Sequence, residues 1–511
     1  MFFTVLPVGS RPPHGAKSRA FLRTDNWDDW FEYATMYDLI YVDRQGEQHD
    51  LGAVKIGEVG QKKPQRRPSI PDRFDELDEP FFSVGQDDSY YEALNALGPD
   101  LRDRILEGLR DVAFDAELFE QILDERVTGL SLLRNVPART VRGQYRRMAR
   151  GGARVTPYHF SYRMPREGRA SPPAPPLEFG VTPETEPPTN IHVITGRNGV
   201  GKTRLLNLMT EAVLNPDDRS KGRFSLDLED NDDSNFTRLV SVSFSAFDDF
   251  TPLSVPRSKS EALEYIYVGL KRIGLSANGK PLAPKSPNYL GREFAESVQI
   301  CSRGARSSRW RRALQVLEAD PIFKDADIAQ LASEDDDDIS SEASRLFARL
   351  SSGHKIVLLT VTRLVETVEE RTLVLLDEPE AHLHPPLLSA FVRALSDLLV
   401  NRNGVAIIAT HSPVVLQEVP MNCVWKLRRN GRQVTAERPE VETFGENVGI
   451  LTREVFGLEV TDSGFHKMLR DQVAQGRSFE RILEHFQGRV GLEGQAIIRG
   501  LIAARNRDGD R

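Results

Sequence analysis

The sequence predicts an α/β fold built around a parallel sheet, because three apolar runs of strand length each end in a glycine-rich or polar segment. The first run leads into the stretch Gly196 to Thr203, the second ends in Asp377-Glu378, and the third ends at His411. Ligands of open α/β sheets bind outside the carboxyl ends of the strands. We therefore expect these three segments to share one site at that edge of the sheet.

The glycine-rich stretch has the spacing G-x-x-x-x-G-K-[ST] between a short apolar strand, Ile191 to Ile194, and an apolar helix that begins at Arg204. In that context the glycines turn the backbone N–H groups toward phosphates, and the helix adds the positive end of its dipole. The alternative is a glycine-rich turn before an ordinary helix, which the flanking pattern disfavours. The residues expected to bind a nucleoside triphosphate are Gly196, Asn198, Gly199, Gly201, Lys202 and Thr203.

The other two strand ends supply the remaining chemistry of an ATPase. Asp377 is predicted to hold Mg²⁺ together with the hydroxyl of Thr203, since both offer oxygen ligands. Glu378 is the candidate catalytic residue that polarises the attacking water. His411, at the end of the third strand, is predicted to reach the γ-phosphate, although a lone histidine is more often structural.

Length and composition restrict the class of protein. A chain of 511 residues predicts two or three domains, and a formal net charge of -8 argues against nucleic-acid binding over the whole surface. The two cysteines, Cys301 and Cys423, have no metal-ligand spacing and fit a reducing cytoplasm. The N-terminus does not read as a signal peptide, and no uncharged apolar run is long enough to span a bilayer. We expect a cytoplasmic protein.

Residues 1–154 are predicted to form an accessory α+β region. Alternating residues predict a hairpin of strands at Tyr37 to Val42 and Gly52 to Ile56, and apolar residues between Leu94 and Ile122 recur at helical intervals, with a break at Gly98-Pro99. A group of arginines follows and leaves two interpretations open, a phosphate-binding face and a solvated helix face. Its members are Arg134, Arg139, Arg142, Arg146, Arg147, Arg150 and Arg154.

Residues 155–430 are predicted to form the core, and residues 431–511 a mainly helical extension. Strands are expected at Tyr158 to Met164 and Leu239 to Phe244, on either side of a proline-rich linker near Ser171 to Pro176 and of the glycine-rich loop. A long helical insertion, residues 251–349, follows, with an acidic run at Glu334 to Asp338. It also carries a basic cluster of Arg303, Arg306, Arg309, Arg311 and Arg312.

One further motif, Leu350 to His354, precedes the apolar helix Ile356 to Val365. With the segments above and the run Asp377 to Pro385, it makes residues 155–430 resemble the ABC-class ATPases of the non-transporter branch, which includes the OLD, RecF and SMC-like proteins. The resemblance implies an ABC-ATPase head with a P-loop core sheet and a helical signature lobe at about residues 251–365. It also implies ATP and Mg²⁺ as cofactors.

The resemblance further implies a homodimer or larger assembly, in which Ser351 and Gly353 of one copy close over the ATP held by another copy. Two positions depart from the pattern of the family. His354 stands where glutamine is usual, and the glutamine expected after the strand Leu239 to Phe244 is absent, so that Asp248 or Asp249 is the candidate replacement.

A looser resemblance extends outside the core. Trp27-Asp28-Asp29, Phe81 to Gln86 and Glu442 to Asn447 are similar to segments of ATPases from bacterial anti-phage defence systems, including Septu-type systems. This implies an ATP-driven switch that controls a partner effector such as a nuclease. The sequence identifies neither the partner nor the trigger.

Three other functions compete with this one. A DNA-repair or chromosome-maintenance ATPase would clamp DNA or RNA with the arginines of 142–154 or 303–312. An intrinsic OLD-like nuclease would need a glutamate and an Asp-x-Asp pair on strands after His411, and the sequence has no such pattern. A transporter subunit fits poorly with the long insertion and the large N-terminal region.

Overall fold

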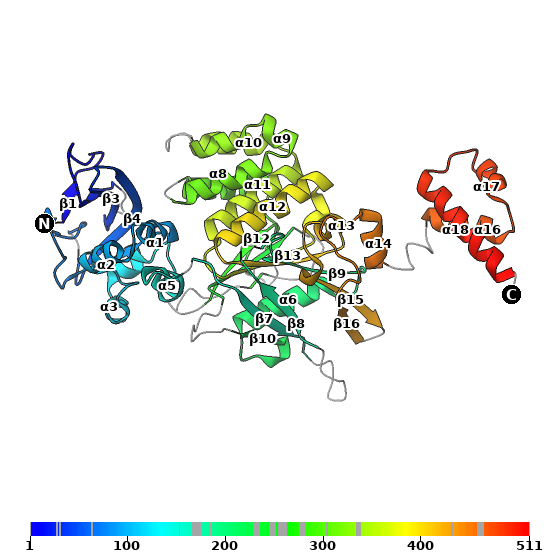
Figure 1. Cartoon of the computed structure of the whole chain (residues 1–511), viewed down its shortest axis with the longest axis horizontal. Helices are drawn as coiled ribbons and strands as arrows, with labels where there is room; N and C mark the ends of the chain where they lie inside the picture. Colours follow the sequence, from blue (N-terminus) through cyan, green and yellow to red (C-terminus); the bar gives the residue numbers. More distant parts are fainter. Residues whose placement is uncertain are drawn as a thin grey trace.

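The computed structural model contains three β-sheets with helices packed around them (Figure 1). It describes residues 2–26, 29, 32–62, 65–152, 154–165, 175–183, 185–227, 236–244, 252–253, 263–274, 282–302, 305–333, 339–430, 433–456 and 464–509. Within these ranges, no helix combines the length and apolar character needed to cross a bilayer. Some residues named from the sequence lie outside the described ranges: Trp27, Asp28, Ser171, Asp248, Asp249, Arg303 and the acidic run 334–338.

The N-terminal region has a six-stranded sheet of order β5-β1-β2-β3-β4-β6. Its strands are β1 (Phe3–Leu6), β2 (Arg19–Thr24), β3 (Met36–Val42), β4 (Gln48–Glu58), β5 (Arg73–Phe74) and β6 (Phe81–Gly85). Strands β3 and β4 pair antiparallel, which confirms the predicted hairpin. Buried side chains of the sheet and of the helices that follow make one continuous apolar core.

Short helices cover this sheet. They are α1 (Asp88–Ala96), α2 (Pro99–Gly108), α3 (Ala116–Ile122), α4 (Ala138–Thr140) and α5 (Arg146–Ala149), with π-helical turns η1 (Thr128–Leu132) and η2 (Val141–Tyr145). Pro99 occupies the first turn of α2, where its missing N–H leaves no hydrogen bond unmade, so the predicted break at Gly98-Pro99 is confirmed. Tyr90, Tyr91 and Tyr145 are fully buried between the helices and the sheet.

A buried carboxyl beside these tyrosines makes the stability of the region depend on pH. Asp111 accepts hydrogen bonds from the backbone N–H of Ala113 at 2.9 Å and from the hydroxyl of Tyr91 at 3.0 Å. Burial raises the pKa of Asp111 to about 7. Because the folded state then binds this proton more tightly than the unfolded state, stability is greatest below the unfolded pKa and is lost as the pH rises toward 7.

We expect Asp111→Asn to remove this loss, since the amide keeps an oxygen acceptor and cannot ionise. Between pH 5 and pH 8 the free energy of unfolding of the wild type should fall by about 2–3 kcal/mol relative to the variant. Urea unfolding at the two pH values measures the difference. Parallel pH dependence in both proteins would show that Asp111 does not titrate in this range.

The central sheet has seven strands in the order β12-β11-β13-β14-β9-β15-β16, and all neighbours pair parallel except β15 and β16. Its strands are β9 (Ile191–Gly196), β11 (Arg238–Ser243), β12 (Glu264–Gly269), β13 (Thr372–Asp377), β14 (Val405–Thr410), β15 (Val424–Asn430) and β16 (Gln433–Glu437). The three apolar runs of the sequence are β9, β13 and β14, and they are adjacent in the sheet. This confirms the predicted α/β core.

Both faces of the central sheet are covered, which explains why its strands are apolar at nearly every position. On β13, Leu373 and Leu375 face one core and Val374 and Leu376 face the other, as expected from the alternation of side chains along a strand. The first core contains α6 (Lys202–Leu214) and a three-stranded sheet of β7 (Tyr158–Arg163), β8 (Leu177–Val181) and β10 (Arg223–Asp227), beside the short turn η3 (Arg219–Lys221).

The second core belongs to the helical lobe. Its elements are α7 (Pro287–Cys301), α8 (Ala305–Leu317), α9 (Pro321–Asp325), η4 (Ile328–Ser333), α10 (Ile339–Arg349), α11 (Ser352–Thr367) and α12 (Pro385–Asn401). Trp310 lies fully buried in this lobe, and its indole N–H donates to Thr362 Oγ1 at 3.1 Å. The predicted helical insertion is therefore a packed lobe on one face of the sheet.

Short turns connect elements of the core: η5 (Pro379–His382) joins β13 to α12, and α13 (Pro413–Leu416) and η6 (Met421–Cys423) join β14 to β15. After β16 the chain continues through α14 (Val448–Phe456) to α16 (Gly464–Ala474), α17 (Phe479–His485) and α18 (Leu492–Gly509). The expected boundary at residue 430 falls inside the β15–β16 hairpin, and Leu451 of α14 still packs in the core of the helical lobe. Helices α16 to α18 share a small core of their own.

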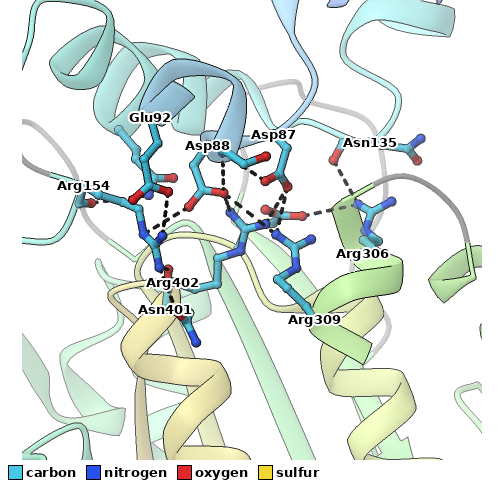
Figure 2. A network of polar contacts seen from close by, with 12 residues as sticks. Asp87, Asp88, Glu92, Asn135, Arg154, Arg306, Arg309, Asn401 and Arg402 are labelled. Atoms are coloured by element: carbon cyan, nitrogen blue, oxygen red, sulfur yellow. Dashed lines mark hydrogen bonds and ion pairs between the residues drawn. The ribbon is translucent and has the colours of Figure 1, made fainter. Parts of the chain in front are cut away.

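A network of charged side chains joins the N-terminal region to the core (Figure 2). Arg402, directly after α12, lies 2.7 Å from Asp87 and 2.6 Å from Asp88, the two residues at the start of α1. Arg309 of α8 lies 2.8 Å from the same Asp87 carboxylate. The N-terminal region, the helical lobe and the end of α12 therefore meet at one ionic cluster.

Candidate nucleotide-binding site

The glycine-rich loop connects the end of β9 to the first turn of α6. Gly201 caps this helix with a φ of 105°, a left-handed conformation that only glycine adopts without strain. The free N–H groups of the first turn of α6, a helix of 13 residues, therefore point toward the loop and can bind an anion. Asn198 and Gly199 lie exposed on the outer side of the loop.

Lys202 is buried, with 4% of its side chain exposed, although it carries a charge. Its Nζ donates to the carbonyl of Gly196 at 3.2 Å and lies 3.7 Å from Glu378 Oε1. A buried ammonium requires such partners because it has lost its hydration. The side chain is thus held over the loop, where a phosphate group can replace the weaker of these partners.

Thr203 and Asp377 meet as the sequence predicts. The hydroxyl of Thr203 donates to Asp377 Oδ1 at 3.1 Å, although 174 residues separate them. Neighbouring oxygen ligands of an octahedral Mg²⁺ lie about 2.9 Å apart, given metal–oxygen distances of about 2.1 Å. The two oxygens therefore fit adjacent positions around a magnesium ion with almost no movement.

Glu378 makes the turn that follows β13. Its φ of 44° and ψ of 60° lie in the left-handed region, which is uncommon for non-glycine residues. Its N–H donates to the carbonyl of Ala409 on β14 at 2.8 Å, which holds the turn. The carboxylate is 37% exposed and lies between Lys202 and His411, 3.7 Å from each.

Glu380 belongs to the same site and was not identified from the sequence. Its Oε1 accepts from Thr410 Oγ1 at 2.6 Å and from the backbone N–H of His411 at 2.9 Å. His411 Nδ1 lies 3.2 Å from the same oxygen. Glu380 therefore fixes the position of His411 beside Glu378. The sequence did contain a signal for Glu380: it is an acidic residue only two positions after Glu378, and from there it can reach the end of the neighbouring strand β14.

Ser351 and Gly353 lie at the N-terminus of α11, a helix of 16 residues. Ser351 is exposed, caps the helix, and places its Oγ 2.7 Å from His354 Nδ1. A Cβ atom on Gly353 would lie 2.4 Å from the carbonyl of His382, so only glycine allows this close approach. The hydroxyl of Ser351 is thus engaged with its own helix, while the other predicted residues gather around Lys202.

Most arginines of the two basic groups are engaged within the chain, so the structure accounts for them without nucleic acid. Arg154 lies 2.9 Å from Glu92, and its guanidinium also donates to the carbonyl of Asn401, joining the N-terminal region to α12 (Figure 2). The other pairs are Arg134–Asp29, Arg142–Glu120, Arg147–Glu370, Arg306–Glu369 and Arg309–Asp87, and Arg311 donates to the carbonyl of Ala332.

Part of the chain matches a known protein family, and nearly the whole chain matches a phage protein. Residues 191–417 match the family described as "AAA domain, putative AbiEii toxin, Type IV TA system". Protein ea59 of Escherichia phage lambda is 42% identical over 532 residues, which cover 99% of this chain and 98% of that protein.

Solved structures with a similar arrangement include the ADP conformation of an ATP-binding cassette of an ABC transporter, with 11% identity, a TM-score of 0.28, and coverage of 52% of this chain and 85% of that one. A bacterial Atm1-family ABC exporter with ATP bound is 15% identical with a TM-score of 0.26, over 63% of this chain and 52% of that one. TM-scores this low carry no conclusion about function.

Proposed function

The chain belongs to the protein family of ea59 from Escherichia phage lambda, and from the geometry of its site we propose that it is an ATP-binding and ATP-hydrolysing switch whose copies associate through shared nucleotide sites. The observation that carries the proposal is the convergence of Lys202, Thr203, Asp377, Glu378 and His411 at the ends of three adjacent parallel strands.

Each of these side chains has a chemical task in ATP hydrolysis. Lys202 and the N–H groups of the loop bind the phosphates, and Thr203 with Asp377 holds Mg²⁺, which would neutralise charge on the phosphates. Glu378 is placed to orient water for attack on the γ-phosphate, and His411 to stabilise the charge that develops there. The hydrogen bond from the Glu378 N–H to Ala409 and the contacts of Glu380 hold the last two in position.

Association of two copies is proposed because the signature residues make their contacts away from the loop of their own chain. The N-terminus of α11 is exposed at Ser351 and Ser352, and its free N–H groups suit an anion. In a symmetric pair, this helix end from one copy would cover the triphosphate held by the other copy. Binding of ATP would then drive assembly, and hydrolysis would release it.

Mixing two inactive variants tests the shared site. Lys202→Ala lacks the phosphate-binding lysine and Ser351→Arg blocks the signature surface, so each variant alone should hydrolyse ATP at background rate. In a mixed pair, one of the two sites combines the intact lysine with the intact serine. An equal mixture should therefore recover roughly one quarter of wild-type activity, since half of the pairs are mixed and half of their sites are complete. Near-normal hydrolysis by Ser351→Arg alone would show that each copy hydrolyses ATP alone, and no recovery in the mixture would contradict a shared site that works independently of the other.

We further propose that this cycle takes place in the cytoplasm and controls a partner effector, such as a nuclease, in the conflict between phages and bacteria. A phage-encoded relative supports a phage-related role. An effector on a separate chain is favoured because, among the described residues after His411, only β15 and β16 are strands, and neither carries the acidic pattern of a metal-dependent nuclease. Copurification with the Glu378→Gln variant, followed by a nuclease assay, tests this.

The DNA-clamping alternative is weakened by the ion pairs of Arg142, Arg147 and Arg309, which are held by carboxylates of the chain itself. Salt-sensitive DNA binding that strengthens with ATP would restore it.

A further inference from the structure

A cavity lies beside the ionic cluster of Figure 2, where the N-terminal region, the helical lobe and the end of α12 meet. Its volume is about 250 Å³, slightly below the range of about 300–1,000 Å³ that is typical of pockets for drug-sized ligands. Most of its lining comes from the start of α1, from α8 and from the last turns of α12. A small ligand in this junction cavity would therefore contact three parts of the chain at once.

The charged side chains of the lining carry an excess of positive charge. They are the four arginines Arg154, Arg309, Arg312 and Arg402 and the three aspartates Asp87, Asp88 and Asp397. With every group ionised, four positive charges stand against three negative ones. Burial also raises the pKa of Asp88 to about 8 despite the charge of Arg402, which reduces the negative charge at neutral pH. The junction cavity therefore favours an anion over a cation.

Arg312 is the arginine of this lining that has no carboxylate of its own. It is exposed on α8, and no acidic side chain among the described residues forms an ion pair with it. By contrast, Arg306 and Arg309 of the same helix pair with Glu369 and Asp87. The guanidinium of Arg312 can therefore bind an anion that enters the cavity without giving up a partner.

Two buried arginines of the lining also keep donors unused. Arg402 is 1% exposed, and its Nε donates to no atom of the described residues. The Nε of Arg309 is likewise buried without an acceptor in the part of the chain that the structure describes. Buried N–H groups that have lost water and found no acceptor destabilise the fold. A ligand with several acceptor oxygens would satisfy them.

We propose that the junction cavity binds a phosphate group, with Arg312 on its exposed side and Arg309 and Arg402 on its buried side. Guanidinium groups bind phosphate through pairs of parallel N–H···O hydrogen bonds. A phosphate group offers at least three acceptor oxygens, whereas a carboxylate offers two. None of the lining residues belongs to the nucleotide-binding site, so this inference does not depend on the proposed function.

The position of the cavity indicates what a bound phosphate would do. Asp87 already joins Arg309 of α8 to Arg402 at the end of α12, at 2.8 and 2.7 Å. Phosphate between the same two arginines would add a second bridge and hold the N-terminal region, the helical lobe and α12 together. Asp397 opposes this binding, because its carboxylate lines the cavity and forms no ion pair with another described residue.

Binding is measured by equilibrium dialysis of radiolabelled inorganic phosphate against the full chain, at an ionic strength kept constant with chloride. The parent carries Lys202→Ala, which removes the phosphate-binding lysine of the nucleotide site. We expect one bound phosphate per chain. Arg312→Gln should weaken this binding about tenfold or more, because it removes charge-assisted hydrogen bonds. Asp397→Asn should strengthen it several-fold, because it removes a like charge. Both side chains are exposed, so neither substitution should unfold the chain.

The matched control is Arg311→Gln. Arg311 is the neighbouring exposed arginine of α8, and it donates to the carbonyl of Ala332 instead of lining the cavity. Its loss should leave phosphate binding unchanged. Equal weakening by Arg311→Gln and Arg312→Gln would show unspecific attraction to a basic helix and overturn the proposal. No bound phosphate in the parent at millimolar concentrations would overturn it as well.

Competition with glycerol phosphate then identifies the source of the phosphate group. If glycerol phosphate displaces the label at a lower concentration than unlabelled phosphate does, the ligand is a small phosphomonoester. If it needs a higher concentration, the ligand is free phosphate. Either result must be lost with Arg312→Gln, since the same guanidinium binds the phosphate group in both cases.

Discussion

Glu378→Gln should hydrolyse ATP about 10²- to 10⁴-fold more slowly than the wild type while binding ATP with undiminished affinity. The amide has nearly the same shape as the carboxylate, so the left-handed turn and the contact of its N–H with Ala409 persist. What is lost is the negative charge beside the attacking water. Since ATP is bound and not consumed, the variant should accumulate as the associated form, measured by single-turnover hydrolysis and by sedimentation with and without ATP.

A suitable control is Glu437→Gln on β16, because this glutamate is 45% exposed, its partners Arg428 and Lys426 lie on β15, and Lys426 keeps Glu454 as a second carboxylate partner. It should hydrolyse ATP at the wild-type rate. Normal turnover by Glu378→Gln would assign the orientation of water to another residue, and Glu380, which contacts the same His411, is the candidate. Slow turnover without association would instead retain the catalytic role and remove the shared site.

The sequence predicted those site residues that lie next to a recognisable apolar strand in the chain. Gly196 to Thr203, Asp377 and His411 each follow an apolar strand directly, and strand order then brings them together, because β14 lies between β9 and β13. Neighbouring parallel strands have their carboxyl ends at the same edge of the sheet, so the positions of these residues after their strands were enough to predict that they meet. For the same reason the strands β9, β11, β13 and β14 were found, whereas the edge strand β12 and the β15–β16 hairpin were not.

The contacts that the sequence did not predict join residues far apart in the chain. Asp320 approaches His354 across 34 positions, and Asp87 approaches Arg402 across 315 positions. No periodicity marks such pairs, because each depends on how the helices pack. The arginines illustrate the consequence. From the sequence alone, a phosphate-binding face and a solvated helix face were both open interpretations of these arginines. Only the fold shows that carboxylates of the same chain neutralise several of them.

We expect the largest effect on stability from a substitution in the ionic cluster that joins the N-terminal region to the core. Arg402 is 1% exposed and contacts both Asp87 and Asp88. Burial raises the pKa of Asp87, but the charge of Arg402 and the hydrogen-bond donors around Asp87 together lower this pKa by more, so that it lies below the ordinary value. Burial and the neighbouring charge of Asp87 raise the pKa of Asp88 despite Arg402. The pair thus shares one negative charge with a fully buried guanidinium.

Arg402→Met should destabilise the chain by about 3–5 kcal/mol, since Asp87 and Asp88 lose the one fully buried cation that contacts both and keep only the more exposed Arg309 and Arg154. The matched control is Arg428→Met. Its Arg428–Glu437 pair has a similar distance of 2.8 Å but is exposed, so that its loss should cost less than about 1 kcal/mol. Urea unfolding of both variants measures the difference. Equal effects would mean that water reaches the cluster.

Adding Asp87→Asn to Arg402→Met separates charge from packing. If the charge of Asp87, deprived of Arg402, causes the loss of stability, the double variant should recover most of the free energy of unfolding, because a neutral amide costs less to bury than an ion. Arg309 then loses its carboxylate partner, but it is more exposed than Arg402 and can reach water. Since Asp87 binds both α8 and the end of α12, ATPase activity of the double variant also reports whether the N-terminal region restrains the helical lobe. Faster hydrolysis by a stable double variant would show that the cluster slows ATP hydrolysis in the wild type. Unchanged hydrolysis would limit the role of the cluster to holding the N-terminal region in place.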